Sequence, residues 1–214
     1  MLIESQRVIN ILTAFKIKVN GVLHVGAHHC EEQPFYNNDL KIGDEHIIWV
    51  DANPELVKYN NDLGKSNVYC AALDDDVRTV NFNITNNGQS SSLLKLGIHK
   101  QFYPGIDVVK RITVTTEKLS SFFDRIEKDP SKYNFWNFDI QGSEYNVFKG
   151  SEHFLKYADI IYTEVNTADV YIGCGKLDEL DKLLAKYNFR RVDTIMTGAQ
   201  WGDAIYVKLK PKTT

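Results

Sequence analysis

The sequence has too few cysteines, too far apart, to be held together covalently. Cys30, Cys70 and Cys174 are odd in number and form no C-x-x-C pair, so the sequence predicts neither a disulfide framework nor a structural zinc site. Each cysteine is expected to be a small buried hydrophobic side chain. This usage indicates a reducing, intracellular compartment, and we expect a cytoplasmic protein.

The sequence also lacks a cluster of positive charge and a long apolar run. Its 25 Lys and Arg residues are outnumbered by 28 Asp and Glu residues, for a formal net charge of -3, and they form no basic patch of the kind that a phosphate backbone requires. Residues 1–20 predict an amphipathic helix rather than a signal peptide or a membrane span. We therefore expect no nucleic-acid partner and no membrane, and the oligomeric state stays open.

The length and the apolar pattern predict one α/β domain over residues 1–214. The 214 residues, 43% of them hydrophobic, can bury one sizeable core and are too few for two full domains. Short apolar runs alternate with helical patterns, which predicts parallel βαβ units with strands buried on both faces. The predicted strands are residues 21–25, 47–51, 68–71, 135–140 and 160–165. The predicted helices are residues 31–40, 54–63, 144–157 and 177–188.

Two segments depart from this alternation. Residues 78–84 and 108–116 have the β-branched, alternating character of a strand pair, and we expect an insertion at about 78–116 or a cover over the sheet edge. Residues 189–196 and 204–209 flank a turn-prone stretch and predict an antiparallel hairpin. The expected fold is a Rossmann-like, doubly wound, mostly parallel sheet ending in an antiparallel β-hairpin. This layout is similar to that of class I methyltransferases.

The first predicted strand leads into a turn of small residues and then a helix start. Residues 21–32 (GVLHVGAHHCEE) bring backbone N–H groups close to any ligand over the strand end, with Gly26 as the pivot. The full G-x-G-x-x-G pattern of dinucleotide-binding proteins is absent, because His28, His29 and Cys30 hold the later positions. An NAD-linked oxidoreductase is thereby disfavoured and stays an alternative.

Asp51 closes the second predicted strand, IIWVD. It follows the glycine turn by about 20 residues, as does the acidic residue that binds ribose hydroxyls in nucleotide-binding α/β folds. Its carboxylate is expected to accept hydrogen bonds from both hydroxyls of an adenosine ribose. The alternative is that Asp51 only caps the helix predicted over residues 54–63.

Seven segments, in order along the chain, resemble the signature blocks of FkbM-family methyltransferases. Any one of them is a weak match, but seven in family order across about residues 22–207 are a strong one. Cys30 is a departure, because these proteins often carry a second glycine there, near the methionine end of the methyl donor. The blocks are residues 23–32 (LHVGAHHCEE), 49–56 (WVDANPEL), 71–74 (AALD), 87–94 (NGQSSSLL), 137–144 (NFDIQGSE), 162–166 (YTEVN) and 201–204 (WGDA).

The resemblance implies a methyltransferase that uses S-adenosylmethionine (SAM) and methylates a hydroxyl of a glycan or small polyhydroxylated molecule. The SAM-binding residues that it implies are Gly26, Ala27 and His28 at the amino-acid end, Asp51, Ala52 and Asn53 around the ribose, and Ala72, Leu73 and Asp74 beside the adenine. The candidate acceptor-binding residues are Gln89, Ser91, Ser92, Asn166, Tyr171 and Trp201.

Asp139 and Glu164 close the fourth and fifth predicted strands. Strand ends of a parallel sheet meet at one edge, so these two carboxylates are expected beside the donor. Either one is a candidate for the base that accepts the proton of an acceptor hydroxyl, or both hold a divalent cation such as Mg²⁺. The alternative is that Asp139 bonds to the turn at residues 141–142 and Glu164 bonds to the backbone.

Other functions stay open on the sequence alone. A catalytically silent module that binds SAM or a nucleotide would share the same pocket. A histidine metal site is disfavoured, because the i, i+4 spacing of His24 and His28 brings side chains together only on a helix and these residues span a strand and a turn.

Overall fold

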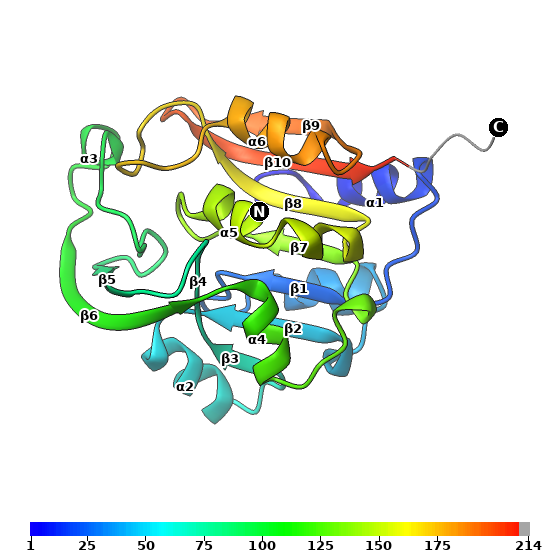
Figure 1. Cartoon of the computed structure of the whole chain (residues 1–214), viewed down its shortest axis with the longest axis horizontal. Helices are drawn as coiled ribbons and strands as arrows, with labels where there is room; N and C mark the ends of the chain where they lie inside the picture. The colour runs from blue at the N-terminus through cyan, green and yellow to red at the C-terminus, as the bar shows by residue number, and fades with distance from the viewer. Residues whose placement is uncertain (210–214) are drawn as a thin grey trace.

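A computed structural model describes residues 1–209 and is centred on a seven-stranded sheet with the order β3-β2-β1-β7-β8-β10-β9 (Figure 1). The neighbours from β3 to β8 pair in parallel, and β10 pairs antiparallel with both β8 and β9. This confirms the expected fold class. The strands of this sheet are β1 (Val22–Val25), β2 (Ile47–Asp51), β3 (Val68–Cys70), β7 (Phe135–Phe138), β8 (Ile160–Asn166), β9 (Phe189–Met196) and β10 (Trp201–Lys208).

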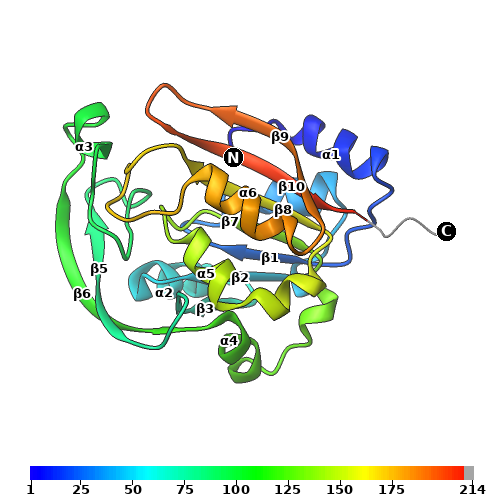
Figure 2. The same cartoon turned by 45° about the horizontal axis from the view of Figure 1, so that its top comes forward.

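Helices cover both faces of the sheet, as the uninterrupted burial of β1, β2, β7 and β8 requires. Side chains of α4, α5 and α6 pack on one face, and those of α1, α2 and a π-helical turn at Phe35–Asp39 pack on the other (Figure 2). No helix within residues 1–209 is long and apolar enough to cross a membrane. The helices are α1 (Ser5–Ala14), α2 (Pro54–Asp62), α3 (His99–Phe102), α4 (Leu119–Arg125), α5 (Glu144–Gly150) and α6 (Leu177–Ala185).

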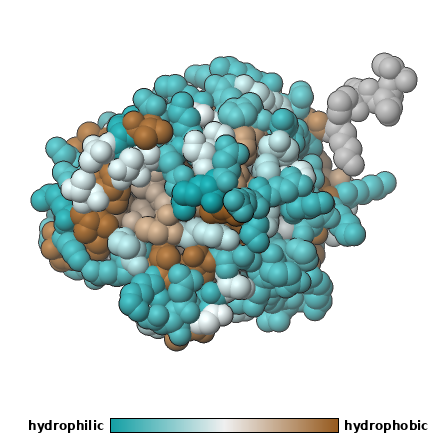
Figure 3. Space-filling model, turned by 60° about the horizontal axis from the view of Figure 1, so that its bottom comes forward, coloured by the Kyte–Doolittle hydropathy of each residue, from teal (hydrophilic) through white to brown (hydrophobic). Residues whose placement is uncertain are grey.

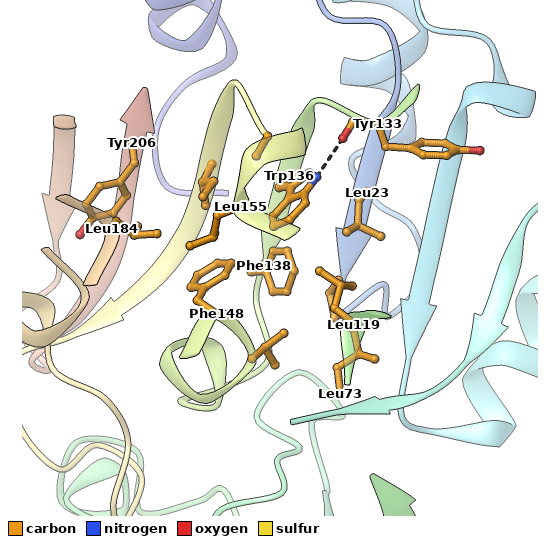
Figure 4. Close-up of a cluster of buried hydrophobic side chains, with 14 of the residues drawn as sticks. Leu23, Leu73, Leu119, Tyr133, Trp136, Phe138, Phe148, Leu155, Leu184 and Tyr206 are labelled. Atoms are coloured by element: carbon orange, nitrogen blue, oxygen red, sulfur yellow. Dashed lines mark hydrogen bonds between the residues drawn. The ribbon is translucent and has the colours of Figure 1, made fainter. Parts of the chain in front are cut away.

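The larger core holds the central strand β7 in place (Figure 4). Trp136 and Phe138 are fully buried against Phe148 of α5 and Leu119 of α4. The indole N–H of Trp136 donates to the backbone oxygen of Tyr133 at 2.8 Å, so the polar atom of this buried side chain is satisfied. The packing fixes the strand whose end carries Asp139.

Three predicted helices differ in detail. Residues 31–40 form a shorter helical segment, with an α-helical start at residues 33–34 and the π-helical turn Phe35–Asp39 after it. The helix predicted over 144–157 ends at Gly150, and a 3₁₀ segment, Glu152–Tyr157, follows it. The N-terminal helix is also shorter than residues 1–20.

The predicted strand pair forms a second, three-stranded sheet beyond the main one. Its order is β4-β6-β5, with β4 at Ala72–Leu73, β5 at Thr79–Thr85 and β6 at Val108–Glu117. The β5–β6 pair is antiparallel, as expected. Figures 1 and 2 place β5, β6 and α3 beside the carboxyl ends of β1, β2 and β7. This insertion therefore covers the edge where ligands of α/β sheets bind.

Candidate active site

Two adjoining cavities lie at the carboxyl ends of β1, β2 and β7. The first is lined by loops after these strands together with β5, and the second has a volume of about 480 Å³ and extends toward α3 and β10. On the face shown in Figure 3, hydrophobic side chains gather around a recess on the side where β5 and β6 lie. Both cavities are lined by the same five residues where they meet, namely Gly26, His28, Gln89, Asp139 and Gln141.

Gly26 makes the close approach of β1 and β7 possible. Its φ is +94°, and a Cβ added there would lie 1.8 Å from the backbone oxygen of Asp139. Its N–H and that of Ala27 both donate to Val50 O, at 2.8 and 2.9 Å. Only glycine fits this turn, which confirms its expected role as the pivot of the loop.

Asp51 organises the loop beside the first cavity, which it lines. One carboxylate oxygen accepts the backbone N–H of His28 and the other that of Asn53, each at 2.8 Å. Asn53, not Asp51, caps α2, because its side chain accepts the N–H of Glu55 at 3.0 Å. Burial raises the pKa of Asp51. Its role toward a ribose stays a prediction that this position supports.

The wall of the first cavity next to Asp51 is largely apolar. It includes the predicted residues Ala72 and Leu73, and also Leu56, Phe82 and Leu93, which the sequence analysis did not single out. Phe82 lies on β5, and alternation alone does not tell which face of a strand pair covers a ligand. An apolar wall beside a carboxylate is the kind of surface that an adenine ring and its ribose need.

Ala27 and Asp74, predicted to bind the cofactor, do not line either cavity. Ala27 is 1% exposed and packs in the core. The carboxylate of Asp74 accepts the guanidinium of Arg78 at 2.5 Å and the N–H of Asp75 at 2.9 Å. The structure thus gives both residues other contacts, and direct contact with the cofactor finds no support in it. Ala52, Asn53 and His28 do line the first cavity.

His28 forms an ion pair at the rim between the cavities. Its Nδ1 lies 2.6 Å from Oε1 of Glu31. The hydrogen bond with Glu31 raises the pKa of His28. Burial opposes ionisation of Glu31, but the bond from His28 and bonds from backbone N–H groups lower its pKa to about 2. The contact with Glu31 therefore favours the protonated imidazole and fixes it at the rim.

The carboxylates of Asp139 and Glu164 meet at the inner end of the second cavity, as their positions on neighbouring strands predict. The amide nitrogen of Gln141 donates to both, at 2.5 Å to Asp139 and 2.6 Å to Glu164. Asp139 is exposed to the cavity yet enclosed by protein, and this enclosure together with the charge of Asp203 raises its pKa to about 6. Burial and the charge of Asp139 raise the pKa of Glu164 further.

The predicted acceptor-binding residues divide into two groups. Gln89, Tyr171 and Trp201 line the second cavity and Ser91 lines the first. Ser92 and Asn166 line neither: Ser92 Oγ donates to the backbone oxygen of Gln141 at 2.8 Å, and Asn166 is 1% exposed with its amide 3.4 Å from Glu164. Ser92 therefore holds the backbone of Gln141 and Asn166 lies against Glu164, and neither residue faces a cavity.

The sequence analysis missed His99 and Tyr103, which line the second cavity from α3 and just beyond it. The Trp201 indole donates to the Tyr103 hydroxyl at 3.0 Å, so β10 and α3 share one wall. The polar linker of residues 86–97 shows no hydrophobic periodicity, and α3, which follows it, is only four residues long, too short for a recognisable helical pattern. Nothing in the local pattern separates these aromatic side chains from ordinary packing.

The Gln141 amide donates to one oxygen of Asp139 and to one oxygen of Glu164, so the other oxygens keep lone pairs, and the divalent cation stays an alternative there. Within residues 1–209, His, Cys, Asp and Glu side chains form no group of three or more placed to hold a metal ion. His24 is buried, and its Nδ1 lies 2.9 Å from the Tyr36 hydroxyl. The histidine metal site that the sequence disfavours thus finds no support in the described residues, and a cation held by Asp139 and Glu164 stays a prediction.

The fold resembles solved Rossmann-like structures. A protein of the NADB-Rossmann superfamily from Streptococcus agalactiae is 11% identical and aligns with 100% of this chain and 72% of its own, with a TM-score of 0.50. Magnesium protoporphyrin IX methyltransferase from Synechocystis PCC 6803, solved with bound SAM, is 10% identical over 96% of this chain and 78% of its own, with a TM-score of 0.42. At these identities the likeness concerns the fold alone.

A third similar structure is a SAM-dependent methyltransferase from Aquifex aeolicus, 14% identical over 97% of this chain and 91% of its own, with a TM-score of 0.39. A comparison with curated proteins found no match. The model of the methyltransferase FkbM domain matches residues 24–191, well over half of the chain. This match confirms the family and the class of enzyme that the seven segments indicate, and with them SAM as methyl donor. The chain belongs to the FkbM methyltransferase family.

Proposed function

We propose that this SAM-dependent methyltransferase transfers its methyl group to a hydroxyl of a glycan or small polyhydroxylated molecule, and that it acts in the cytoplasm. The observation that carries the proposal is the position of Asp139, which lines both cavities at their junction. A base at this point reaches a hydroxyl in the second cavity beside a methyl group presented from the first. The three free cysteines support the proposed location.

The first cavity supplies the donor site in this proposal. Gly26 and His28 would hold the amino-acid end, Asp51 the ribose hydroxyls, and the apolar wall around Leu73 and Phe82 the adenine. When bound, SAM supplies a methyl group on a sulfonium that is already a good leaving group. The protein's own task is therefore to align the acceptor oxygen and to accept its proton.

Asp139 is the proposed base. Its pKa of about 6 keeps it ionised at neutral pH while leaving it more basic than an ordinary aspartate. Burial holds the pKa of Glu164 well above that of an ordinary glutamate, so this side chain is the protonated partner. The two carboxyl groups thus have different tasks because their surroundings differ.

The lining of the second cavity supports an acceptor without negative charge. Four more acidic side chains line it besides Asp139, and none of its lining residues within the described chain is lysine or arginine. Its positive groups are His28, paired with Glu31, and the amino group of Met1, 3.5 Å from Glu32. A phosphate or carboxylate on the acceptor would be repelled, whereas hydroxyl groups would find many acceptors and aromatic faces.

The test is transfer of a radiolabelled methyl group from SAM into matched glycosides: a neutral hexoside, the same ring with a carboxylate, and the same ring with a phosphate. We expect labelled ether in the neutral product and none in the anionic ones. Labelling only of the anionic rings would contradict the acceptor class. A protein that binds SAM and labels none of a broad acceptor panel would instead be the silent binding module.

With a working acceptor, Asp139→Asn and Glu164→Gln separate the two carboxyl groups. Asp139→Asn keeps the shape and removes the base, so kcat is expected to fall by about 10²–10⁴-fold while SAM affinity stays within a few-fold. Glu164→Gln should cost much less, because a protonated Glu164 is not the base. The reverse ranking would assign the base to Glu164, and near-normal rates in both variants would leave alignment as the whole of the chemistry.

A further inference from the structure

Gln141 lies between the two carboxyl groups that the proposed chemistry uses, and it lines both cavities. Its amide nitrogen donates one hydrogen to Asp139 and the other to Glu164, at 2.5 and 2.6 Å. An amide NH₂ group has two donors, and both are used here. The Gln141 side chain therefore links the end of β7 to β8 through the carboxyl groups of Asp139 and Glu164.

A third contact agrees with this orientation of the amide. The Tyr171 hydroxyl donates to Oε1 of Gln141. Burial raises the pKa of Tyr171, so the phenol stays protonated. An ionised Asp139 carboxylate only accepts hydrogen bonds, so it requires the amide nitrogen on its side. The amide oxygen then faces Tyr171, which can donate to it.

The backbone of Gln141 is held as firmly as its side chain. Its φ of +57° lies in the left-handed region, which a non-glycine residue adopts at a cost. Ser92 Oγ donates to the carbonyl oxygen of Gln141 at 2.8 Å, and Ser92 Oγ in turn accepts the N–H of Leu94 at 2.9 Å. Two segments distant in the sequence, around residues 92 and 171, therefore hold the backbone and the side chain of Gln141.

We propose that Gln141 is a positioning residue: its amide holds Asp139 and Glu164 as one hydrogen-bonded unit facing the acceptor, while Tyr171 bonds to this amide and Ser92 bonds to the backbone carbonyl of Gln141. The assignment of a base to this unit rests on the proposed function. A hydrogen bond to the ionised form favours it, so Gln141 counteracts the burial and the negative neighbours that raise the pKa of Asp139. Gln141 thereby keeps this carboxylate ionised and directed at the cavity.

The test measures the pKa of Asp139 directly, with neither donor nor acceptor present. Protein labelled with ¹³C at the aspartate carboxyls is titrated by NMR, and the signal missing from Asp139→Asn assigns the residue. Gln141→Met keeps the length of the side chain and removes both donors, so we expect the pKa of Asp139 to rise by about one to two units, the equivalent of one hydrogen bond to a charged group. Tyr171→Phe should raise it less, in the same direction.

Gln89→Met is the matched control, because Gln89 lines the same two cavities and bonds to neither carboxylate within the described chain. We expect no change in the Asp139 pKa there. An unchanged pKa in folded Gln141→Met, or an equal rise in Gln89→Met, would overturn the proposal. If Gln141→Met does not fold, Tyr171→Phe decides it: an unchanged pKa counts against the proposal and a rise supports it. If the Asp139 pKa rises in Gln141→Met but the transfer assay labels no acceptor, the proposed function is refuted and the positioning role of Gln141 stands.

Discussion

The carboxylate of Asp51 bonds to the backbone of its own loop and also faces the first cavity. Each of its oxygens accepts one backbone N–H, from His28 or from Asn53. A carboxylate oxygen has a second lone pair, so these bonds leave capacity for ribose hydroxyls. Holding the loop backbone and binding a ribose are therefore compatible in one side chain.

Asp51→Ala is expected to weaken SAM binding by about 1.5–3 kcal/mol, the range for hydrogen bonds to a charged group. Calorimetric titration with SAM measures this. Asp62→Ala is the control, because Asp62 also belongs to the segment after β2 and its side chain is 62% exposed in a surface ion pair with Lys58. Unchanged affinity in folded Asp51→Ala would remove the ribose assignment.

At the scale of elements, the site depends on how closely the ends of β1 and β7 approach. β1 pairs with β7 in parallel register from Val22–Phe135 to Val25–Phe138. Beyond that register, Gly26 lies directly against the backbone of Asp139. The glycine thus sets the distance between the loop of the first cavity and the proposed base.

Gly26→Ala should separate these two strand ends. The added Cβ would lie 1.8 Å from the backbone oxygen of Asp139 at a φ of +94°, and only a shift of the backbone could relieve this clash. We expect a loss of about 3 kcal/mol or more in the free energy of unfolding, measured in urea. Gly198→Ala, where a Cβ meets nothing within 4 Å, should change stability little. Comparable losses in the two variants would show that Gly26 has no special backbone role.

At the scale of the whole molecule, buried carboxyl groups make stability depend on pH. Glu144 and Glu164 are each 3% exposed. Burial raises the pKa of Glu144 from 4.5 to about 8 and that of Glu164 well above its ordinary value. The folded state then binds more protons than the unfolded state, so the free energy of unfolding falls as pH rises. For Glu144 this stabilisation is fully present below pH 4.5 and is lost as pH rises through about 8.

Urea unfolding at pH 5, 6, 7 and 8 should therefore show falling stability, with a slope of about 1 kcal/mol per pH unit for each such group. The pKa of Glu31 is lowered to about 2, so its titration changes the free energy of unfolding only below pH 5. Glu144→Gln should flatten the slope, whereas Glu45→Gln, at a side chain that is 73% exposed, should leave it unchanged. Stability that rises from pH 5 to 8 in the wild-type protein would contradict this account.

The sequence by itself determined the strands of the site and the carboxylates at their ends. Apolar runs such as residues 47–51 and 160–165 need cover on both faces, and parallel strands then end at one edge, so Asp51, Asp139 and Glu164 had to lie near one another. The position of a strand and of the carboxylate at its end can be read from a few consecutive residues.

Only the tertiary structure decided how these groups act on one another. Gln141 reaches both carboxylates because Ser92 and Tyr171, far away in sequence, close around it. His99 and Tyr103 enter the second cavity because the inserted sheet folds over the strand ends. Hydrogen bonds and pKa shifts depend on distance and burial in space, and neither is encoded in the spacing of residues along the chain.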